Sequence, residues 1–309
     1  MAKLVFLLSL PTDDNDYQQE QAVAANETAR RLDVSLQIVY ADNDAIKQSD
    51  QILQAVQSDD AKRPNAILFE PLGSTSLPQA ARSASARGIG WVVLNRNAEY
   101  IAELRRTRRA PIFSVSSDHL GIGRIQGLQF AALLPQGGSV LYIQGPSENS
   151  AAKERTLGMQ EVKPASIKIN MLKGQWTDES AYKAVSSWMR LSTAGVQIVD
   201  LVGAQDDSMA MGARRAMAEH PDEALRKRWL GVPFAGCDGL VNTGQKYVRD
   251  GQLAATVVVP PNTKLALEML VSAMRDGKTL PEQVLTVPTS FPPVEELIRS
   301  QRDKTGPDS

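Results

Sequence analysis

Residues 198–239 repeat one pattern that limits the fold of the whole chain. A short apolar run ends at small and acidic residues, 204–208, and a segment of helical period follows at once. A second apolar run and a second acidic end, with the sequence FAGCDG, follow at 231–239. Apolar strands that alternate with helices are typical of a parallel sheet covered on both faces. Ligands of such sheets bind beyond the carboxyl ends of the strands, so Asp206 and Asp238 are candidate ligand contacts.

The same alternation of strand and helix extends through the rest of the chain. Apolar runs predict strands at 4–10, 35–41, 66–72, 91–95, 112–116, 139–145, 167–174, 198–202, 231–235 and 253–259. Helical periodicity predicts helices at 16–32, 46–57, 77–87, 151–162, 180–191 and 263–275, with Asp44 as an N-cap and Gly88 as a helix end. Right-handed crossovers between such strands give parallel sheets. We therefore expect two α/β lobes joined by crossings near Ser116 and Val259.

Composition excludes several classes of function. The chain has 309 residues and a formal net charge of −1, which creates no field that attracts nucleic acid or an anionic membrane. The single cysteine, Cys237, excludes an intrachain disulfide and a cysteine-rich zinc site. No apolar run has the length of a bilayer span, so we expect no membrane insertion.

The first residues, MAKLVFLLSLPTDD, imitate an export signal. They contain one lysine and a short apolar run, and no small-residue cleavage site follows. We interpret them as the first strand. The expected location is the periplasm if a leader has been removed from this chain, and the cytoplasm if Met1 is the native start.

No catalytic machinery is visible in the sequence. The two histidines, His119 and His220, have no spacing that supports a metal site or a nucleophile–base pair. Gly121, Gly123 and Gly127 are spaced one residue too widely for the dinucleotide fingerprint. We interpret these glycines as small residues at a helix start that pack on the sheet. We expect no catalytic residue, no metal and no cofactor.

Other prominent residue patterns have structural interpretations. Residues 98–111 contain four arginines and predict a solvated loop or a short helix. Trp91 and Trp188 are expected in the core. Three methionines at helical spacing are interpreted as packing residues and not as a cofactor site: Met209, Met211 and Met217.

Four segments, in this order, resemble one known family. They are SAAKERTLGM (150–159), AQDDSMAMGA (204–213), FAGCDG (234–239) and DGQLAATVVVPP (250–261). The chain resembles the type I periplasmic binding proteins of the ribose and galactose branch from about residue 3 to residue 292. The sugar-sensing domain of lactose-repressor-like regulators has the same fold.

The resemblance implies an α/β fold of two doubly wound parallel-sheet lobes joined by a hinge of three crossings. The implied N-terminal lobe is 1–116 plus 260–288, and the C-terminal lobe is 117–259 plus 289–309. It also implies a clamp that closes over one small neutral sugar or polyol. The implied ligand contacts, carried over by position, are Ser9, Asn15, Tyr17, Gln18, Asn95, Arg96, Arg155, Trp176, Asp206, Asp238 and Asn262.

These residue types suit a sugar. Carboxylate and guanidinium groups bind neighbouring hydroxyls in pairs. Aromatic rings such as Trp176 and Tyr17 cover the apolar face of a sugar ring. Two alternatives stay open from the residues alone. Either Asp206 or Asp207 caps the helix that begins near Ser208, and Asp238 could cap a turn before Gly239.

Three positions depart from the family pattern. Asn95 stands where ribose-binding relatives have an aspartate, and Cys237 stands where they have an aromatic residue. Val259 replaces an expected glutamine, whose contact we assign to Asn262. The resemblance therefore does not specify ribose.

We predict a substrate-binding protein that holds a neutral sugar or polyol and delivers it to an ABC-type permease. The alternative is a cytoplasmic sugar-sensing protein with the same clamp and no DNA-binding domain. Neither hypothesis includes nucleic acid as a partner.

Overall fold

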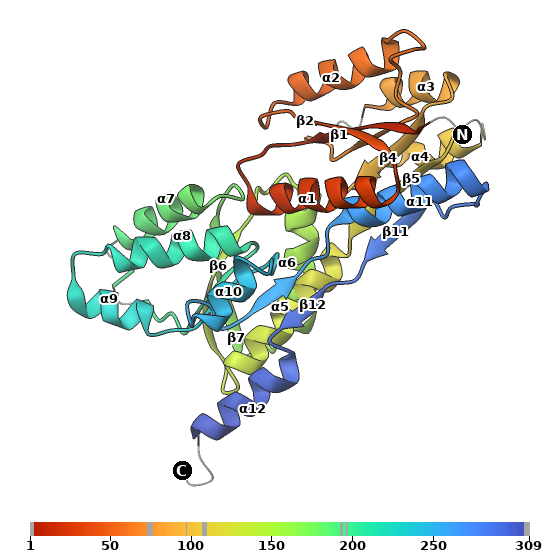
Figure 1. The fold of residues 1–309 in the computed structure, drawn as a ribbon. Helices are drawn as coiled ribbons and strands as arrows, with labels where there is room; N and C mark the ends of the chain where they lie inside the picture. The colour runs from red at the N-terminus through yellow and green to blue at the C-terminus, as the bar shows by residue number, and fades with distance from the viewer. Residues whose placement is uncertain are drawn as a thin grey trace. The chain divides into compact units, whose positions relative to one another are not determined.

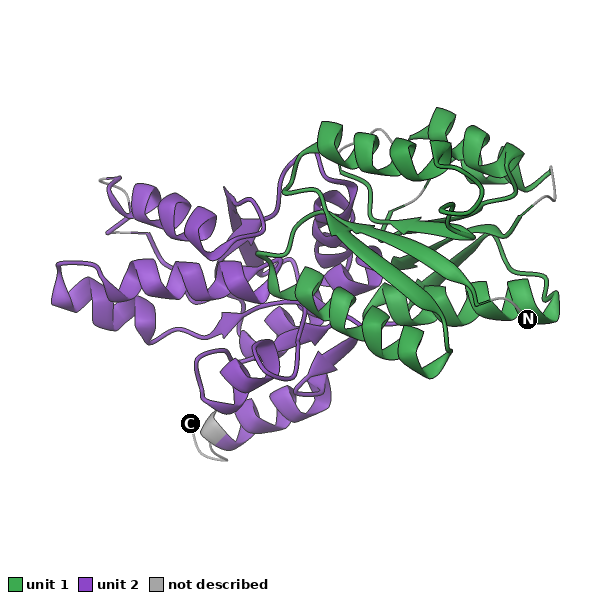
Figure 2. Cartoon of the chain, turned by 45° about the horizontal axis from the view of Figure 1, so that its top comes forward, with its two compact units in different colours: residues 1–117, 261–286 green, residues 118–260, 287–309 purple. Residues whose placement is uncertain are grey.

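The computed structural model describes residues 3–72, 77–96, 98–106, 110–191, 194–195 and 197–305. The chain forms two compact units (Figure 2). Unit 1 contains Met1–Ser117 and Pro261–Thr286, and unit 2 contains Asp118–Pro260 and Val287–Ser309. The chain passes from one unit to the other three times.

Unit 1 is built on a six-stranded sheet with the strand order β11-β5-β4-β3-β1-β2. Every neighbouring pair in this sheet is parallel. The strands are β1 (Val5–Leu10), β2 (Ser35–Tyr40), β3 (Ala66–Phe69), β4 (Gly90–Leu94), β5 (Ile112–Ser117) and β11 (Gln283–Thr286). The carboxyl ends of these strands lie at one edge of the sheet, and ligands of parallel sheets bind at that edge.

Helices cover both faces of this sheet (Figure 1). Along β1, Phe6, Leu8 and Leu10 pack in one core, while Leu7 packs in the other. The first core includes α1 (Asp16–Arg31) and α11 (Asn262–Asp276), and the second includes α2 (Ala45–Gln57), α3 (Pro78–Ala86) and α4 (Tyr100–Arg105). Side chains alternate between the faces of a strand, which explains why the central strands β3 (AILF) and β4 (GWVVL) are apolar on both faces.

Unit 2 contains a second parallel sheet, of four strands, with the order β7-β6-β8-β9. Its strands are β6 (Gly138–Gln144), β7 (Ile167–Lys173), β8 (Leu201–Ala204) and β9 (Phe234–Ala235), and the separate pair is β10 (Thr256–Val258) with β12 (Thr289–Phe291). One core holds α7 (Asp178–Met189), α8 (Asp207–Ala218) and α9 (Glu223–Leu230). The other holds α5 (His119–Leu133), α6 (Ser150–Val162) and α12 (Val294–Thr305); a short helix, α10 (Gly244–Arg249), precedes β10.

Most expected elements are present, but four strands differ by three residues at one end from their predicted bounds. The strand expected at 66–72 ends at Phe69. The strand expected at 198–202 begins at Leu201, and Ile198 is exposed. The strand expected at 231–235 is reduced to two residues. The strand expected at 253–259 is short and pairs antiparallel with β12, although single bridges join it in parallel to Ala235 and Asp238. Hydrophobic runs locate strands, but the hydrogen-bonding partner sets their bounds.

The two predicted helix ends, Asp44 before α2 and Gly88 after α3, are confirmed. Asp44 accepts hydrogen bonds from the amides of Ile46 (2.8 Å) and Lys47 (3.2 Å) and caps α2. Gly88 follows α3 with a φ of 73°, a left-handed conformation that glycine adopts without cost.

The glycines of α5 were expected to pack on the sheet, but Gly123 and Gly127 pack against α6. A Cβ on Gly123 would overlap the carbonyl oxygen of Arg155, and one on Gly127 would lie 2.8 Å from the carbonyl oxygen of Met159. A Cβ on Gly158 would in turn overlap the carbonyl oxygen of Leu120. These glycines let α5 and α6 approach each other closely, so they pack on a helix and not on the sheet.

The basic segment that begins at residue 98 is more ordered than a solvated loop. It forms the short helix α4, in which Ile101 and Leu104 are buried. Arg105 donates hydrogen bonds to the carbonyl oxygens of Ile112 (2.6 Å), Leu280 (2.5 Å) and Pro281 (3.1 Å). Residues 107–109 of this segment lie outside the described residues.

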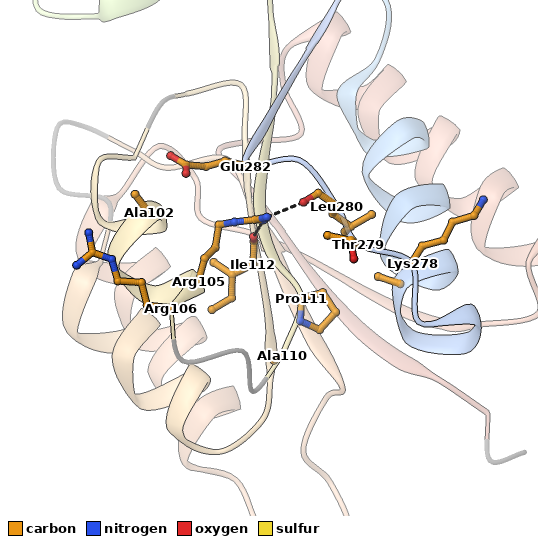
Figure 3. A pocket seen from close by; sticks show the side chains of 11 residues that line it. Ala102, Arg105, Arg106, Ala110, Pro111, Ile112, Lys278, Thr279, Leu280 and Glu282 are labelled. Carbon is orange, nitrogen blue, oxygen red and sulfur yellow. Dashed lines mark hydrogen bonds between the residues drawn. The ribbon is translucent and has the colours of Figure 1, made fainter.

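Arg105 also lines a cavity of about 720 Å³ in unit 1 (Figure 3). The cavity lies where β5 and β11 begin, because its lining includes Ile112 and Glu282. The guanidinium of Arg105 is occupied by the three carbonyl groups, and Figure 3 shows it directed toward Leu280. This cavity is therefore at the opposite edge of the sheet from the carboxyl ends of the strands.

Within the described part of the chain, no helix combines the length and the apolar character that crossing a bilayer requires.

Candidate functional site

Glu70 is the centre of a buried polar cluster at the carboxyl edge of the unit 1 sheet. It follows β3 directly and is 3% exposed. Its Oε2 accepts a hydrogen bond from Gln18 Nε2 at 2.9 Å, and its Oε1 accepts one from Asn95 Nδ2 at 2.9 Å. The guanidinium of Arg96 lies 3.6 Å from the same carboxylate. Three predicted contact residues, Gln18, Asn95 and Arg96, therefore share one acidic partner that the sequence analysis did not select.

Gln48 of α2 holds Glu70 and Ser9 in place. Its Nε2 donates to the carbonyl oxygen of Glu70 at 2.8 Å and to Ser9 Oγ at 3.3 Å. Its Oε1 accepts from the amide of Leu72 at 2.9 Å. Gln48 is 2% exposed, so these bonds form where water cannot compete.

The other predicted residues of unit 1 also have partners in the protein. Asn15 caps α1 by accepting from the amide of Tyr17 at 3.0 Å. Asn262 Nδ2 lies 3.4 Å from Ser117 Oγ, and its Oδ1 accepts from Thr286 Oγ1 at 3.2 Å. A ligand contact for Ser9, Asn15, Tyr17 and Asn262 remains a prediction.

Arg155 is the corresponding centre in unit 2. It is 5% exposed, and its Nη1 donates to the carbonyl oxygen of Gln205 and lies 3.8 Å from Asp238 Oδ1. Its guanidinium is also 5.4 Å from the centre of the Trp176 ring, within the range of a cation–π interaction. The structure thus brings Arg155, Trp176 and Asp238 together.

Gln205 connects the elements that carry these residues. Its Oε1 accepts from the amide of Gly145 at 2.9 Å, at the end of β6. Its Nε2 donates to the carbonyl oxygen of Ala152 at 3.0 Å and to Thr156 Oγ1 at 2.9 Å, both on α6. Gln205 is fully buried. It therefore fixes the carboxyl ends of β6 and β8 against the helix that supplies Arg155.

The two neighbouring aspartates at the end of β8 have different roles. Asp206 is the N-cap of α8 and accepts from the amide of Met209 at 2.5 Å. Asp207 accepts from the amide of Gly239 at 2.8 Å and from Thr256 Oγ1 at 2.7 Å. Asp207 is therefore a structural residue that holds the turn after Asp238. The ligand contact of Asp206 stays a prediction.

Three predicted contact residues have left-handed backbone conformations. The φ angles are 56° for Asn95, 62° for Trp176 and 97° for Asp238. Such conformations cost about 1–3 kcal/mol for most residues other than glycine, whereas asparagine and aspartate adopt them more readily. Asp238 is held by backbone hydrogen bonds to Val257 (2.9 Å) and from Val259 (3.0 Å). The left-handed conformation of Trp176, a bulky residue, supports a function for this edge of unit 2.

Trp176 lies in the loop between β7 and α7, where it packs on a glycine. A Cβ on Gly145 would overlap the indole ring. Trp91 and Trp229 are fully buried and Trp188 is 7% exposed, while Trp176 is half-buried. The prediction that Trp91 and Trp188 belong to the core is confirmed, and the indole of Trp176 has surface left for a ligand.

Cys237 is fully buried beside this cluster. Burial raises the pKa of its thiol well above the ordinary value of 9.0, and Arg155 opposes this rise. A neutral thiol is a small apolar group. A small buried side chain therefore occupies the position at which the family pattern has an aromatic residue.

These groups can bind but show no arrangement for bond cleavage. Each unit supplies one guanidinium and one carboxylate at the carboxyl ends of parallel strands, which is the chemistry that binds hydroxyl pairs. Among the described residues, no group of three or more His, Cys, Asp or Glu side chains could hold a metal ion. Glu70 could have been found from the sequence by the rule that selected Asp238, because both are carboxylates that follow a buried strand.

Two parallel α/β units, each with a guanidinium paired to a carboxylate beyond the ends of its strands, indicate a solute-binding protein. Comparison with known proteins gives the family. The chain belongs to the periplasmic binding protein domain family, whose model matches residues 6–279. It is therefore a substrate-binding protein and not an enzyme.

Relatives of known name cover most of the chain. The ribose import binding protein of Salmonella typhimurium is 30% identical over 262 residues, 85% of this chain and 81% of the relative. The D-allose-binding periplasmic protein of Escherichia coli is 26% identical over 280 residues, 89% of this chain and 86% of the relative. The fold is shared with a solute-binding protein of Actinobacillus succinogenes solved with bound D-allose. That structure has a TM-score of 0.80 and 20% identity and covers 96% of this chain and 100% of its own.

Proposed function

We propose that this chain binds a small neutral sugar or polyol and delivers it to an ABC-type permease. The observation that carries the proposal is the pairing of a guanidinium with a carboxylate in each unit. Arg96 lies 3.6 Å from Glu70, and Arg155 lies 3.8 Å from Asp238. Each pair cancels its own charge, so a neutral ligand suits both pairs better than an acid or a base.

A polyol matches the geometry of such pairs. Neighbouring hydroxyls donate and accept hydrogen bonds at once, and a carboxylate beside a guanidinium offers both partners. The half-buried indole of Trp176 can cover the C–H face of a sugar ring. The proposed contacts are the eleven residues that the resemblance implies, and Glu70 holds two of them, Gln18 and Asn95, by hydrogen bonds of 2.9 Å.

The named relatives support the sugar class and the transport role. One is an import binding protein for ribose, and another binds D-allose in the periplasm. We extend the periplasmic location and the ABC permease partner to this chain on that basis. Ribose itself is not proposed, because Asn95, Glu70 and Cys237 give the site its own polar pattern.

The experiment is a thermal-shift screen of pentoses, hexoses and polyols, followed by calorimetry with the best ligand. A ligand that binds the folded state at about 100 times its Kd adds about 2.7 kcal/mol of stability, so the melting temperature rises. The variant Asp238→Ala is expected to lose about 30-fold or more in affinity, because it leaves the buried guanidinium of Arg155 without its carboxylate. Glu27→Ala, on the exposed face of α1, is the control and should bind as the wild type does.

Two results would overturn the proposal. One is a wild-type melting temperature that no sugar or polyol raises at about 10 mM. The other is unchanged calorimetric affinity in a folded Asp238→Ala variant.

A further inference from the structure

Glu70 dictates how the side-chain amide of Gln18 is oriented. An ionised carboxylate only accepts hydrogen bonds, so the amide must turn its NH₂ group toward it. Gln18 Nε2 donates to Glu70 Oε2 at 2.9 Å, and Asn95 Nδ2 donates to the other oxygen at the same distance. With both carboxylate oxygens engaged in this way, the carbonyl oxygen of Gln18 is fixed on the side away from Glu70.

The carbonyl oxygen of Gln18 has no hydrogen-bond donor among the residues that the structure describes. Gln18 is 7% exposed, in the first turn of α1 beside the polar cluster of unit 1. A buried acceptor without a donor is costly, and native proteins rarely keep one without a function. The unsatisfied oxygen and its rigid support are two independent observations that point to a missing donor.

We propose that Glu70 is a specificity-determining positioning residue, which fixes Gln18 so that its carbonyl oxygen accepts a hydrogen bond from one ligand hydroxyl. The proposal rests on the proposed function and names the ligand feature that this part of unit 1 selects. The site requires a free O–H at one position. An analogue in which that hydroxyl is replaced by hydrogen or by a methyl ether cannot donate, and it leaves the oxygen unsatisfied. Sites built to bond a hydroxyl reject analogues that lack it.

The charge of Glu70 is what gives the orientation. In Glu70→Gln the side chain keeps its shape, but an amide at position 70 both donates and accepts. The amide of Gln18 can then turn over and present NH₂ in place of oxygen. The substitution therefore removes the preference for a donor without removing any atom of Gln18.

The test measures the affinity for the best sugar of the screen and for each of its single-deoxy analogues by calorimetry. In the wild type, one analogue is expected to lose about 10- to 100-fold in affinity through the contact with Gln18. In Glu70→Gln and in Gln18→Met, the loss for that same analogue should shrink to about 3-fold or less. The losses for the other analogues should stay as in the wild type. Glu27→Gln, an exposed carboxylate on the same helix as Gln18, should leave all the losses unchanged.

A purely structural role of Glu70 would lower the affinity for all analogues together, because the whole site would be less ordered. A change confined to one analogue therefore distinguishes the positioning role from a structural one. Thermal unfolding checks that each variant folds, and Gln18→Met keeps the test decisive if Glu70→Gln does not fold. If the wild type binds sugars and both variants keep its full pattern of losses, the assignment of Glu70 is wrong while the proposed function stands. If the wild type binds no sugar or polyol, the proposed function and this inference fail together.

Discussion

Asn95 Nδ2 donates a 2.9 Å hydrogen bond to Glu70 Oε1 and so joins the carboxyl ends of the neighbouring strands β4 and β3. The sequence has an amide at position 95 where ribose-binding relatives are expected to have an aspartate. The structure supplies the acid from the next strand, at 3.6 Å from Arg96. A guanidinium–carboxylate pair is therefore present in unit 1, although the residue before the arginine is neutral.

Asp207 is expected to stabilise unit 2. Its carboxylate is 3% exposed and accepts from the amide of Gly239 at 2.8 Å and from Thr256 Oγ1 at 2.7 Å. An amide in Asp207→Asn cannot accept on both sides and presents NH₂ to one donor. We expect the free energy of unfolding to fall by about 2–4 kcal/mol, measured by denaturant titration.

The matched control is Asp250→Asn, which removes an exposed carboxylate that pairs with Lys246. Its effect should lie within experimental error, because exposed ion pairs contribute little. Equal stability of the two variants would contradict the structural role of Asp207.

Gly123→Ala is expected to weaken both stability and sugar affinity. The added methyl would overlap the carbonyl oxygen of Arg155, so α6 must move away from α5. Overpacking of this kind costs about 1–3 kcal/mol, which exceeds the gain of up to about 1 kcal/mol from the higher helix propensity of alanine. Thermal unfolding and calorimetry measure the two effects.

Gly195→Ala is the control for this substitution, because the nearest atom to its Cβ would be 4.0 Å away. Gly195→Ala should change neither the thermal stability nor the sugar affinity. A Gly123→Ala protein that is more stable than the wild type would show that α5 and α6 are not in close contact.

Trp176 is expected to report ligand binding by its fluorescence. It is the half-buried tryptophan of the four, and Arg155 lies 5.4 Å from its ring centre. A sugar that covers the indole changes its environment, whereas Trp91 and Trp229 are fully buried and Trp188 is 7% exposed. We expect Trp176→Phe to abolish most of the sugar-dependent change in emission. Trp188→Phe should retain the sugar-dependent change in emission. Loss of that change in Trp188→Phe would contradict the assignment of the signal to Trp176.

The pKa of Cys237 predicts lower stability in alkaline solution. Burial raises this pKa in the folded state above the ordinary value of 9.0 that the unfolded chain has. The folded state therefore holds its proton more tightly, and the stabilisation is fully present below about pH 9 and is lost as the pH rises above it. Burial raises the pKa of Tyr142 as well, and its hydroxyl donates to Gln126 Oε1 at 2.9 Å.

Denaturant titrations between about pH 8 and pH 10 measure this effect. The fall in stability should be shallower in Cys237→Ala, in which Tyr142 still contributes. The thiol should react with a disulfide reagent in the unfolded protein and resist it in the native one. Rapid modification of the native protein would contradict the burial of this side chain.

The order of strands and helices followed from residues close together in the chain. Apolar runs located the strands, and Asp44 and Gly88 bounded helices through contacts that reach only a few positions. The acidic strand ends at Asp206 and Asp238 followed from the same local pattern. These features were predictable because neighbouring residues determine periodicity, capping and turns.

The partners within each site were decided by the tertiary structure. Gln18 and Glu70 are 52 positions apart and meet because β3 pairs with β1 in the sheet. The different roles of Asp206 and Asp207 depend on where Gly239 and Thr256 return to β8. The close contact of α5 with α6 depends on the glycines of one helix facing the backbone of the other. The sequence by itself determined the order of the strands and helices and the polar residues that follow the strands. Only the packing of distant segments decided which of these residues share a hydrogen bond, because that choice depends on strand order and not on neighbours in the chain.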